Sequence, residues 1–368
     1  MRVAQITPLW EQVPPVGYGG TENVVSLLTE ALVQRGHHVT LFASGDSETM
    51  AHLEPGCDRA LRPLGMLPRE YARYEERQLD KIFSRTAEFD VIHSHMDLAA
   101  LPYSKQSATP VVHTIHGILT AATEPIFSQY RRENFVSISN SQRRDDLGLN
   151  YIATVYNAIA LDQFPFHAHP AAPPYLVFLG RMSVEKGPHL AIEIAKRSGW
   201  PLKIAGKIDF ENQRFFEQQV APHIDGQQIQ FLGEVSQAEK KTLMGQATAT
   251  LFPITWPEPF GLVMAESMAC GTPVIAMALG SAPEIVVDGH TGFLCHTLPD
   301  CIAAVTKLPS IRRPDCRDHV AVNFGVGRMV DGYEAVYRQV IADRARSRAS
   351  VTPVGDRPQP IPDYPVTR

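Results

Sequence analysis

The sequence has few cysteines, little excess charge and no long apolar run, and each shortage excludes a class of protein. Its five cysteines are odd in number and lack CxxC spacing, so we expect reduced thiols in a cytoplasmic protein. A formal net charge of −5 gives no support for nucleic-acid binding through bulk electrostatics. No apolar run approaches the ~20 residues of a membrane-spanning helix, and the N-terminal stretch does not resemble a signal peptide. Only peripheral contact with a membrane is left open.

What the sequence does contain is an alternation of apolar strands and amphipathic helices. A chain of 368 residues, 44% hydrophobic and 20% charged, is long enough for two globular domains. The alternation predicts a doubly wound α/β domain over residues 1–160, a proline-rich linker at 161–174 and a second α/β domain over 175–323. A last amphipathic helix is predicted at about 324–345, and an aperiodic tail, expected to be disordered, at 346–368.

Two carboxylates stand out in one short segment. Pro257 and Pro259 hold Glu258 outside any helix. The helix predicted at 260–270 is apolar almost all round, so Glu266 lies where an ionised carboxylate needs partners that packing does not supply. The first amides of this helix lack intrahelical acceptors and suit phosphate or hydroxyl oxygens. These amides are those of Phe260, Gly261 and Leu262. The segment as a whole suits a sugar joined to a phosphate.

A glycine-rich loop follows the first predicted strand. A GxGxxG dinucleotide fingerprint starting at Gly17 would need glycine at position 22, where Glu22 stands. Gly19 and Gly20 let a ligand approach the main chain just before a helix, so we favour a backbone cradle for phosphate or sugar. A tight turn without a ligand is the alternative.

Two cations and four histidines lie near other predicted strand ends. Arg181 and Lys186 flank a strand-to-helix loop, where they would neutralise a diphosphate or form a solvated pair. His116 closes a strand before a glycine, where open parallel sheets place ligand-contacting residues. For the remaining histidines we favour a structural role, and a shared metal site is the alternative. They are His93, His95 and His113.

At this point the motifs resemble a known family. The segment EPFGLVMAE resembles the signature of retaining glycosyltransferases of family 4, the "glycosyl transferases group 1" enzymes of GT-B fold. Further landmarks occur in order: YGGTE at 18–22, TIHG at 114–117, SNS at 139–141, LGRMSVEKG at 179–187 and GSAPEIVVDGHTGFL at 280–294. The resemblance covers residues 1 to about 345, and the YGGTE-type loop is most similar to a bacterial branch that includes antibiotic-tailoring enzymes.

This resemblance implies two Rossmann-like domains facing across a cleft, with the final helix crossing back to the N-terminal one. The N-terminal domain would bind the acceptor and the C-terminal domain the nucleotide sugar. The donor-binding positions implied by the family are Gly19, Gly20, Arg181, Lys186, Gly206, Lys207, Phe260, Gly261, Leu262 and Glu266. Arg181 and Lys186 would bind the diphosphate, Glu266 the ribose hydroxyls, and Gly206 with Lys207 would lie near the base.

The resemblance also implies the groups around the reacting sugar, which are His116, Glu258, Arg181 and Lys186. Glu258 would meet the transferred sugar, and His116 would donate to a hydroxyl or stabilise developing charge. The implied reaction moves a hexose, expected to be glucose, from a nucleoside diphosphate, with UDP favoured, to a hydroxyl of a sugar, lipid or small metabolite. The anomeric configuration would be retained without a metal or other cofactor.

Three other functions stay open at this stage. Glu258 and Glu266 are also a pair of carboxylates such as a glycoside hydrolase uses, which would release sugar without a nucleotide. A dinucleotide oxidoreductase would bind nicotinamide. A non-catalytic protein would bind the nucleotide sugar without turnover.

Overall fold

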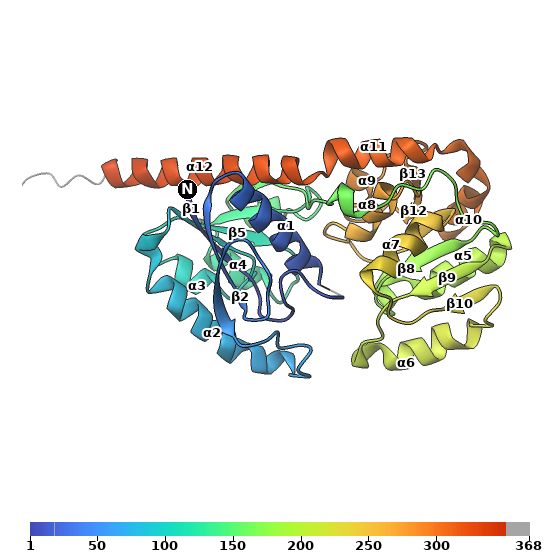
Figure 1. The fold of residues 1–368 in the computed structure, drawn as a ribbon, viewed down its shortest axis with the longest axis horizontal. Helices are drawn as coiled ribbons and strands as arrows, with labels where there is room; N and C mark the ends of the chain where they lie inside the picture. The colour runs from blue at the N-terminus through green and yellow to red at the C-terminus, as the bar shows by residue number, and fades with distance from the viewer. Residues whose placement is uncertain (18, 351–368) are drawn as a thin grey trace, which may run out of the picture.

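The protein consists of two α/β domains that lie side by side (Figure 1). The computed structural model describes residues 1–17 and 19–350. Each domain is built on one parallel sheet with helices around it, which confirms the predicted pair of Rossmann-like domains. Tyr18 of the YGGTE loop and the tail beyond 350 lie outside the described residues.

The N-terminal sheet has seven strands in the order β3-β2-β1-β4-β5-β6-β7. Its strands are β1 (Arg2–Ile6), β2 (His38–Ser44), β3 (His52–Cys57), β4 (Val91–Ser94), β5 (Val111–Ile115), β6 (Asn134–Ser137) and β7 (Tyr151–Thr154). The helices of this domain are α1 (Gly20–Gln34), α2 (Pro68–Phe83), α3 (Leu101–Ser104) and α4 (Glu124–Gln129). The edge strand β3 was not predicted, because Pro55 and Gly56 interrupt its pattern.

The C-terminal sheet has six strands in the order β10-β9-β8-β11-β12-β13. Its strands are β8 (Leu176–Leu179), β9 (Leu202–Ala205), β10 (Ile229–Phe231), β11 (Ala249–Phe252), β12 (Val274–Met277) and β13 (Gly292–Cys295). The helices are α5 (Pro188–Ser198), α6 (Gln213–Phe215), α7 (Gln237–Gln246), α8 (Leu262–Ala269), α9 (Ala282–Ile285), α10 (Leu298–Lys307) and α11 (Arg313–Asn323). In both sheets the central strands are buried on both faces, as doubly wound folds require.

The stretch predicted as a linker is held against α11 by two arginines. Arg313 donates from Nε to the carbonyl oxygen of His167 at 2.6 Å. Arg317 donates from Nη1 to the carbonyl of Phe164 at 2.7 Å. The chain leaves the N-terminal domain near Ile159 and returns to it after Phe324. The Ile159 amide donates to the Phe324 carbonyl at 2.8 Å. The two crossings between the domains are therefore adjacent.

Helix α12 (Val326–Ser350) crosses back and packs on α1, β5 and β7 of the N-terminal domain, running along one edge of the molecule (Figure 1). The residues predicted to face inward are all buried, namely Met329, Tyr333, Val336, Tyr337 and Val340. The helix continues through 346–350, where the disordered tail was predicted to begin; the remainder of that tail, 351–368, lies outside the described residues.

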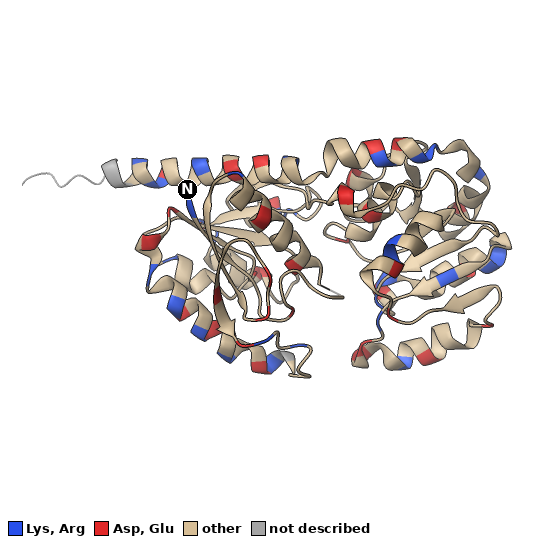
Figure 2. Cartoon of the chain, viewed as in Figure 1, with Lys and Arg blue, Asp and Glu red and all other residues tan. Residues whose placement is uncertain are grey.

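Charged residues of both signs alternate along α2 and α12 (Figure 2). This agrees with the overall balance of charge and with solvated outer faces. No helix among the described residues is both long and apolar enough to cross a bilayer. The cysteines at 57, 270, 295, 301 and 316 are all free thiols.

Candidate active site

A cleft of about 430 Å³ lies between the two domains and is lined by residues of both. Every site residue predicted from the sequence lines it. These residues are Gly19, Gly20 and His116 from the N-terminal domain, and Arg181, Lys186, Gly206, Lys207, Glu258, Phe260, Gly261, Leu262 and Glu266 from the C-terminal domain. Segments far apart in the sequence thus meet in one cavity, because the carboxyl ends of both parallel sheets face it.

Glu258 is fixed in the loop between β11 and α8. Its Oε2 atom accepts hydrogen bonds from Lys186 Nζ at 2.5 Å and from Trp256 Nε1 at 2.7 Å. Gly280 has a positive φ of 57°, and a Cβ there would lie 2.3 Å from the Glu258 amide nitrogen. Only glycine therefore lets this turn approach the loop, where the Ser281 amide donates to the Glu258 carbonyl at 2.9 Å.

The N-terminus of α8 opens into the cleft. Gly261 precedes the helix with a positive φ of 75°, and no side chain of the described residues caps it. Gly261, Leu262 and Val263 all line the cavity. The unpaired amides and the helix dipole together favour an anion at this position.

Glu266 is 4% exposed and has a partner that the sequence analysis missed. Lys240 on α7 donates from Nζ to Glu266 Oε1 at 2.8 Å. The second carboxylate oxygen, Oε2, is buried and has no hydrogen-bond partner among the described residues. The expectation that packing leaves Glu266 unpaired is thus wrong for one oxygen, while the other remains suited to a hydroxyl donor.

The cations of the cleft are held by acidic neighbours. Arg181 Nη2 lies 3.1 Å from Glu185 Oε1, and its Nη1 lies 3.8 Å from Asp209 Oδ2. Lys207 Nζ lies 3.3 Å from Asp209 Oδ1. The Lys186 side chain is only 18% exposed, so it is not a solvated surface lysine. An anionic ligand would draw on cations that the fold already positions.

His116 closes β5 on the N-terminal side of the cleft. Its Nε2 atom lies 2.8 Å from His95 Nδ1, and its backbone amide donates to Asp97 Oδ1 at 3.0 Å. Burial lowers the pKa of His116 to about 4, so its ring is neutral near pH 7. Burial also raises the pKa of Asp97 to about 6.

Of the other three histidines, His93 and His95 have hydrogen-bond partners for their ring nitrogens and His113 has none among the described residues. His93 contacts Tyr337 Oη and Thr114 Oγ1, each at 2.7 Å. His113 is buried, with no partner for either ring nitrogen among the described residues. Within the described part of the chain, no three His, Cys, Asp or Glu side chains are grouped so that they could hold a metal ion.

Several cleft residues were not assigned a role from the sequence: Trp10, Glu22, Arg62, Gln237, Lys240 and Trp256. Glu22 in the first turn of α1 is 3% exposed, its Oε1 has no partner among the described residues, and burial raises its pKa to about 7. Gln237 Nε2 donates across the cleft to the Gly17 carbonyl at 2.9 Å. Glu22 could have been noticed in the sequence, because it stands where a GxGxxG motif would have its third glycine.

Two motifs without an assigned role meet at the domain boundary. Glu284 on α9 accepts hydrogen bonds from the amides of Asn140 and Ser141 at 2.8 and 2.7 Å. Its Oε2 also accepts from Tyr156 Oη at 2.8 Å. The SNS and APEI segments therefore form a contact between the two domains.

Comparison with known proteins gives consistent matches along both halves of the chain. Residues 18–163 match the family model "Glycosyltransferase Family 4", and residues 161–310 match "Glycosyl transferases group 1". Glycogen synthase of Mycobacterium tuberculosis (strain H37Rv) is 28% identical over 346 residues, covering 80% of this chain and 82% of that protein.

Solved structures of the same fold align over nearly the whole chain. Sucrose-phosphate synthase from Thermosynechococcus elongatus aligns with a TM-score of 0.76 at 21% identity, covering 93% of this chain and 99% of that one. Anabaena HepE, solved in complex with UDP and glucose, aligns with a TM-score of 0.69 at 18% identity, covering 92% and 100%.

Proposed function

We propose that this chain, which belongs to the family 4 glycosyltransferases and has their GT-B fold, transfers a hexose from a nucleoside diphosphate sugar to an acceptor hydroxyl with retention of anomeric configuration. One observation carries the proposal. A helix N-terminus, two cations and a carboxylate oxygen without a partner among the described residues line one wall of a cleft, and His116 lines the opposite wall. This set of groups matches a diphosphate with a sugar on one side and a ribose on the other.

The diphosphate would bind between Arg181, Lys186 and the first amides of α8. Negative charge grows on the departing diphosphate as the glycosidic bond breaks. Groups that are already oriented toward it stabilise the transition state without reorganising at the moment of reaction. Glu266 would accept hydrogen bonds from the ribose hydroxyls through Oε2, and Gly206 with Lys207 would border the base.

Glu258 would bind the transferred sugar rather than attack it. Lys186 and Trp256 both donate to its Oε2, which restricts that oxygen to hydrogen bonding. In the proposed reaction the acceptor hydroxyl attacks on the face that the diphosphate leaves, and a phosphate oxygen takes the hydroxyl proton. No protein nucleophile is then needed, and the configuration is retained.

The N-terminal wall would complete the site. Gly19 and Gly20 would approach the donor phosphate through their main chain, and the acceptor would lie against the loops around them. The acceptor class remains a hydroxyl of a sugar, lipid or small metabolite. Anabaena HepE, of similar fold, was solved in complex with UDP and glucose, which supports UDP-glucose as the first donor to test. The five cysteines without CxxC spacing support a cytoplasmic enzyme.

A panel of UDP-, GDP- and ADP-sugars tests this function. We expect UDP-glucose to raise the melting temperature most and to be turned over with release of UDP, without added metal. NMR of the product anomeric proton would report retention. Release of sugar from a simple glycoside without nucleotide would instead indicate a hydrolase, and binding without turnover a non-catalytic protein.

A further inference from the structure

A continuous chain of buried hydrogen bonds links the cleft to the crossover helix. It starts at His116 and passes through six side chains that are fully or almost fully buried. In order these are His95, Gln5, Tyr337, His93, Thr114 and Tyr333. They come from β1, β4 with the residue after it, β5 and α12, so segments from both ends of the sequence contribute to this series of hydrogen bonds.

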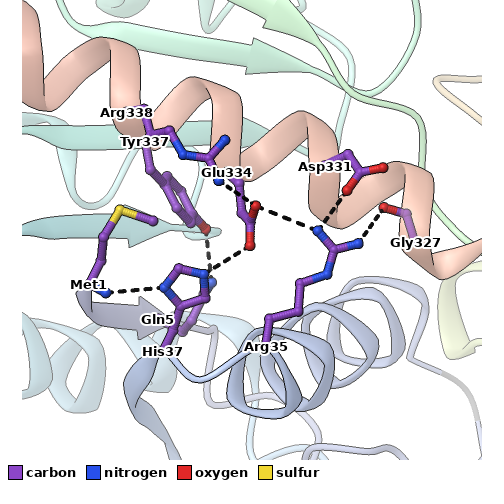
Figure 3. A network of polar contacts seen from close by, with 9 residues as sticks. All are labelled: Met1, Gln5, Arg35, His37, Gly327, Asp331, Glu334, Tyr337 and Arg338. Atoms are coloured by element: carbon purple, nitrogen blue, oxygen red, sulfur yellow. Dashed lines mark hydrogen bonds and ion pairs between the residues drawn. The ribbon is translucent and has the colours of Figure 1, made fainter.

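The half of this chain nearest the cleft has short and well-defined contacts. His116 Nε2 lies 2.8 Å from His95 Nδ1, and His95 Nε2 lies 3.0 Å from Gln5 Oε1. Gln5 Nε2 donates to Tyr337 Oη at 3.0 Å, a contact between β1 and α12 that Figure 3 shows. Gln5 and Tyr337 are 0% exposed and His95 is 1% exposed.

The amide of Gln5 gives this chain a direction. Its NH₂ group donates to Tyr337, so its oxygen accepts a proton from His95 Nε2. A neutral imidazole carries one N–H, which leaves His95 Nδ1 as an acceptor. The contact between His95 and His116 then requires the proton on His116 Nε2. Burial lowers the pKa of both rings, in agreement with neutral imidazoles.

One ring nitrogen of His116 is left over. Within the described residues no hydrogen bond involves His116 Nδ1, and His116 lines the cleft. We propose that Gln5, His95 and Tyr337 are positioning residues that hold His116 with its proton on Nε2, so that His116 accepts a hydrogen bond from a donor-sugar hydroxyl through Nδ1. The sugar contact rests on the proposed function; the tautomer does not. This differs from the hydrogen-bond donor that the family resemblance implies.

The crossover helix supports this arrangement from outside the sheet. Glu334 Oε1 on α12 lies 2.9 Å from His37 Nε2, and Asp331 Oδ1 on the same helix lies 2.6 Å from Arg35 Nη1 (Figure 3). These contacts join the first half of α12, within two turns of Tyr337, to the C-terminal end of α1 and the loop after it. The orientation of His116 therefore depends on a helix at the far end of the sequence.

NMR of ¹⁵N-histidine-labelled protein tests the tautomer directly and needs no substrate. The His116→Gln spectrum identifies the His116 signals. We expect a protonated Nε2 and an unprotonated Nδ1 in the wild type between about pH 6 and 8. A proton on Nδ1, or an even mixture of tautomers, would overturn the proposal.

Variants test whether the chain positions His116. Tyr337→Phe removes the hydroxyl that orients Gln5 while keeping the ring, and Tyr333→Phe is the matched control on the same helix face. We expect Tyr337→Phe to mix the His116 tautomers and to lower kcat with UDP-glucose by about ten- to a hundredfold, with UDP affinity by calorimetry unchanged. Tyr333→Phe should change the His116 tautomers and kcat much less.

Equal effects of the two substitutions would assign them to the packing of α12 and contradict the proposal. If Tyr337→Phe does not fold, Gln5→Leu takes its place, because it removes the amide that links Tyr337 to His95. Its effects on the tautomers and on kcat are then compared with those of Tyr333→Phe. If no nucleotide sugar is turned over by the wild type, the proposed function fails, while the NMR result still decides the tautomer.

Discussion

Lys186 Nζ lies 2.5 Å from Glu258 Oε2, so the cation assigned to the diphosphate is paired with the carboxylate assigned to the sugar. Trp256 binds the same oxygen through Nε1, and the Lys186 ammonium also lies 4.9 Å from the centre of its ring. The two roles are therefore coupled. Removing either charge leaves the other largely buried without its partner.

Lys186→Ala should lower kcat with UDP-glucose by about ten- to a thousandfold, because one preorganised positive charge is lost from the leaving group. Steady-state release of UDP measures this. Lys196→Ala on the outer face of α5 is the control and should keep wild-type activity. Wild-type turnover of Lys186→Ala would remove this residue from the mechanism.

Glu266→Ala should weaken UDP binding by about ten- to a hundredfold, because charge-assisted hydrogen bonds to ribose are lost and Lys240 is left without its carboxylate. Isothermal calorimetry measures the affinity. Glu193→Ala, which removes an exposed carboxylate on α5, provides the comparison. Unaltered binding by Glu266→Ala would contradict the ribose contact.

Glu22→Gln should change how stability depends on pH. Burial raises the folded-state pKa of Glu22 from 4.5 to about 7, so its contribution to stability is complete below the unfolded pKa and is lost as pH rises through 7. The full loss is roughly 3 kcal/mol. We expect calorimetric melting temperatures of the wild type to fall more between about pH 5 and 8 than those of Glu22→Gln. Parallel curves would contradict this, and Glu211→Gln should match the wild type.

Glu284→Ala should loosen the contact between the domains. Two backbone amides and Tyr156 Oη lose their acceptor, which should lower the free energy of unfolding by about 1–3 kcal/mol. We also expect a lower kcat with a much smaller change in UDP affinity, because most of the groups assigned to the nucleotide belong to the C-terminal domain. Denaturant titration and calorimetry measure the two effects. Glu211→Ala, an exposed change in the same domain, should alter neither.

Local patterns predicted two α/β domains and several of the residues that line the cleft, whereas the crossing of the last helix and the donor positions Gly206 and Lys207 came from the resemblance to the family. The apolar run after Pro259 predicted a helix N-terminus here, although α8 begins at Leu262 and not at Phe260 as predicted. The spacing of Tyr333 and Tyr337 predicted the inward face of the last helix. These signals depend on neighbours a few residues away along the chain. A single sequence displays such neighbours directly.

Pairings between distant residues could not be predicted in this way. Lys240 and Glu266 are 26 positions apart, and Asn140 and Glu284 are 144 apart. Glu266 stood out on its apolar helix, but nothing near it in the sequence identified Lys240 as its partner. Only the closure of the two sheets around the cleft brings such partners together.

The adjacent crossings at Ile159 and Phe324 restrict how the two halves can move. A rotation of one domain against the other must take these neighbouring peptide segments as its pivot, because displacing them would break the 2.8 Å hydrogen bond that joins them. The cavity would then widen most at the rim farthest from this axis. Substrate entry and product release would follow that rim, and both sheets would stay intact throughout the cycle.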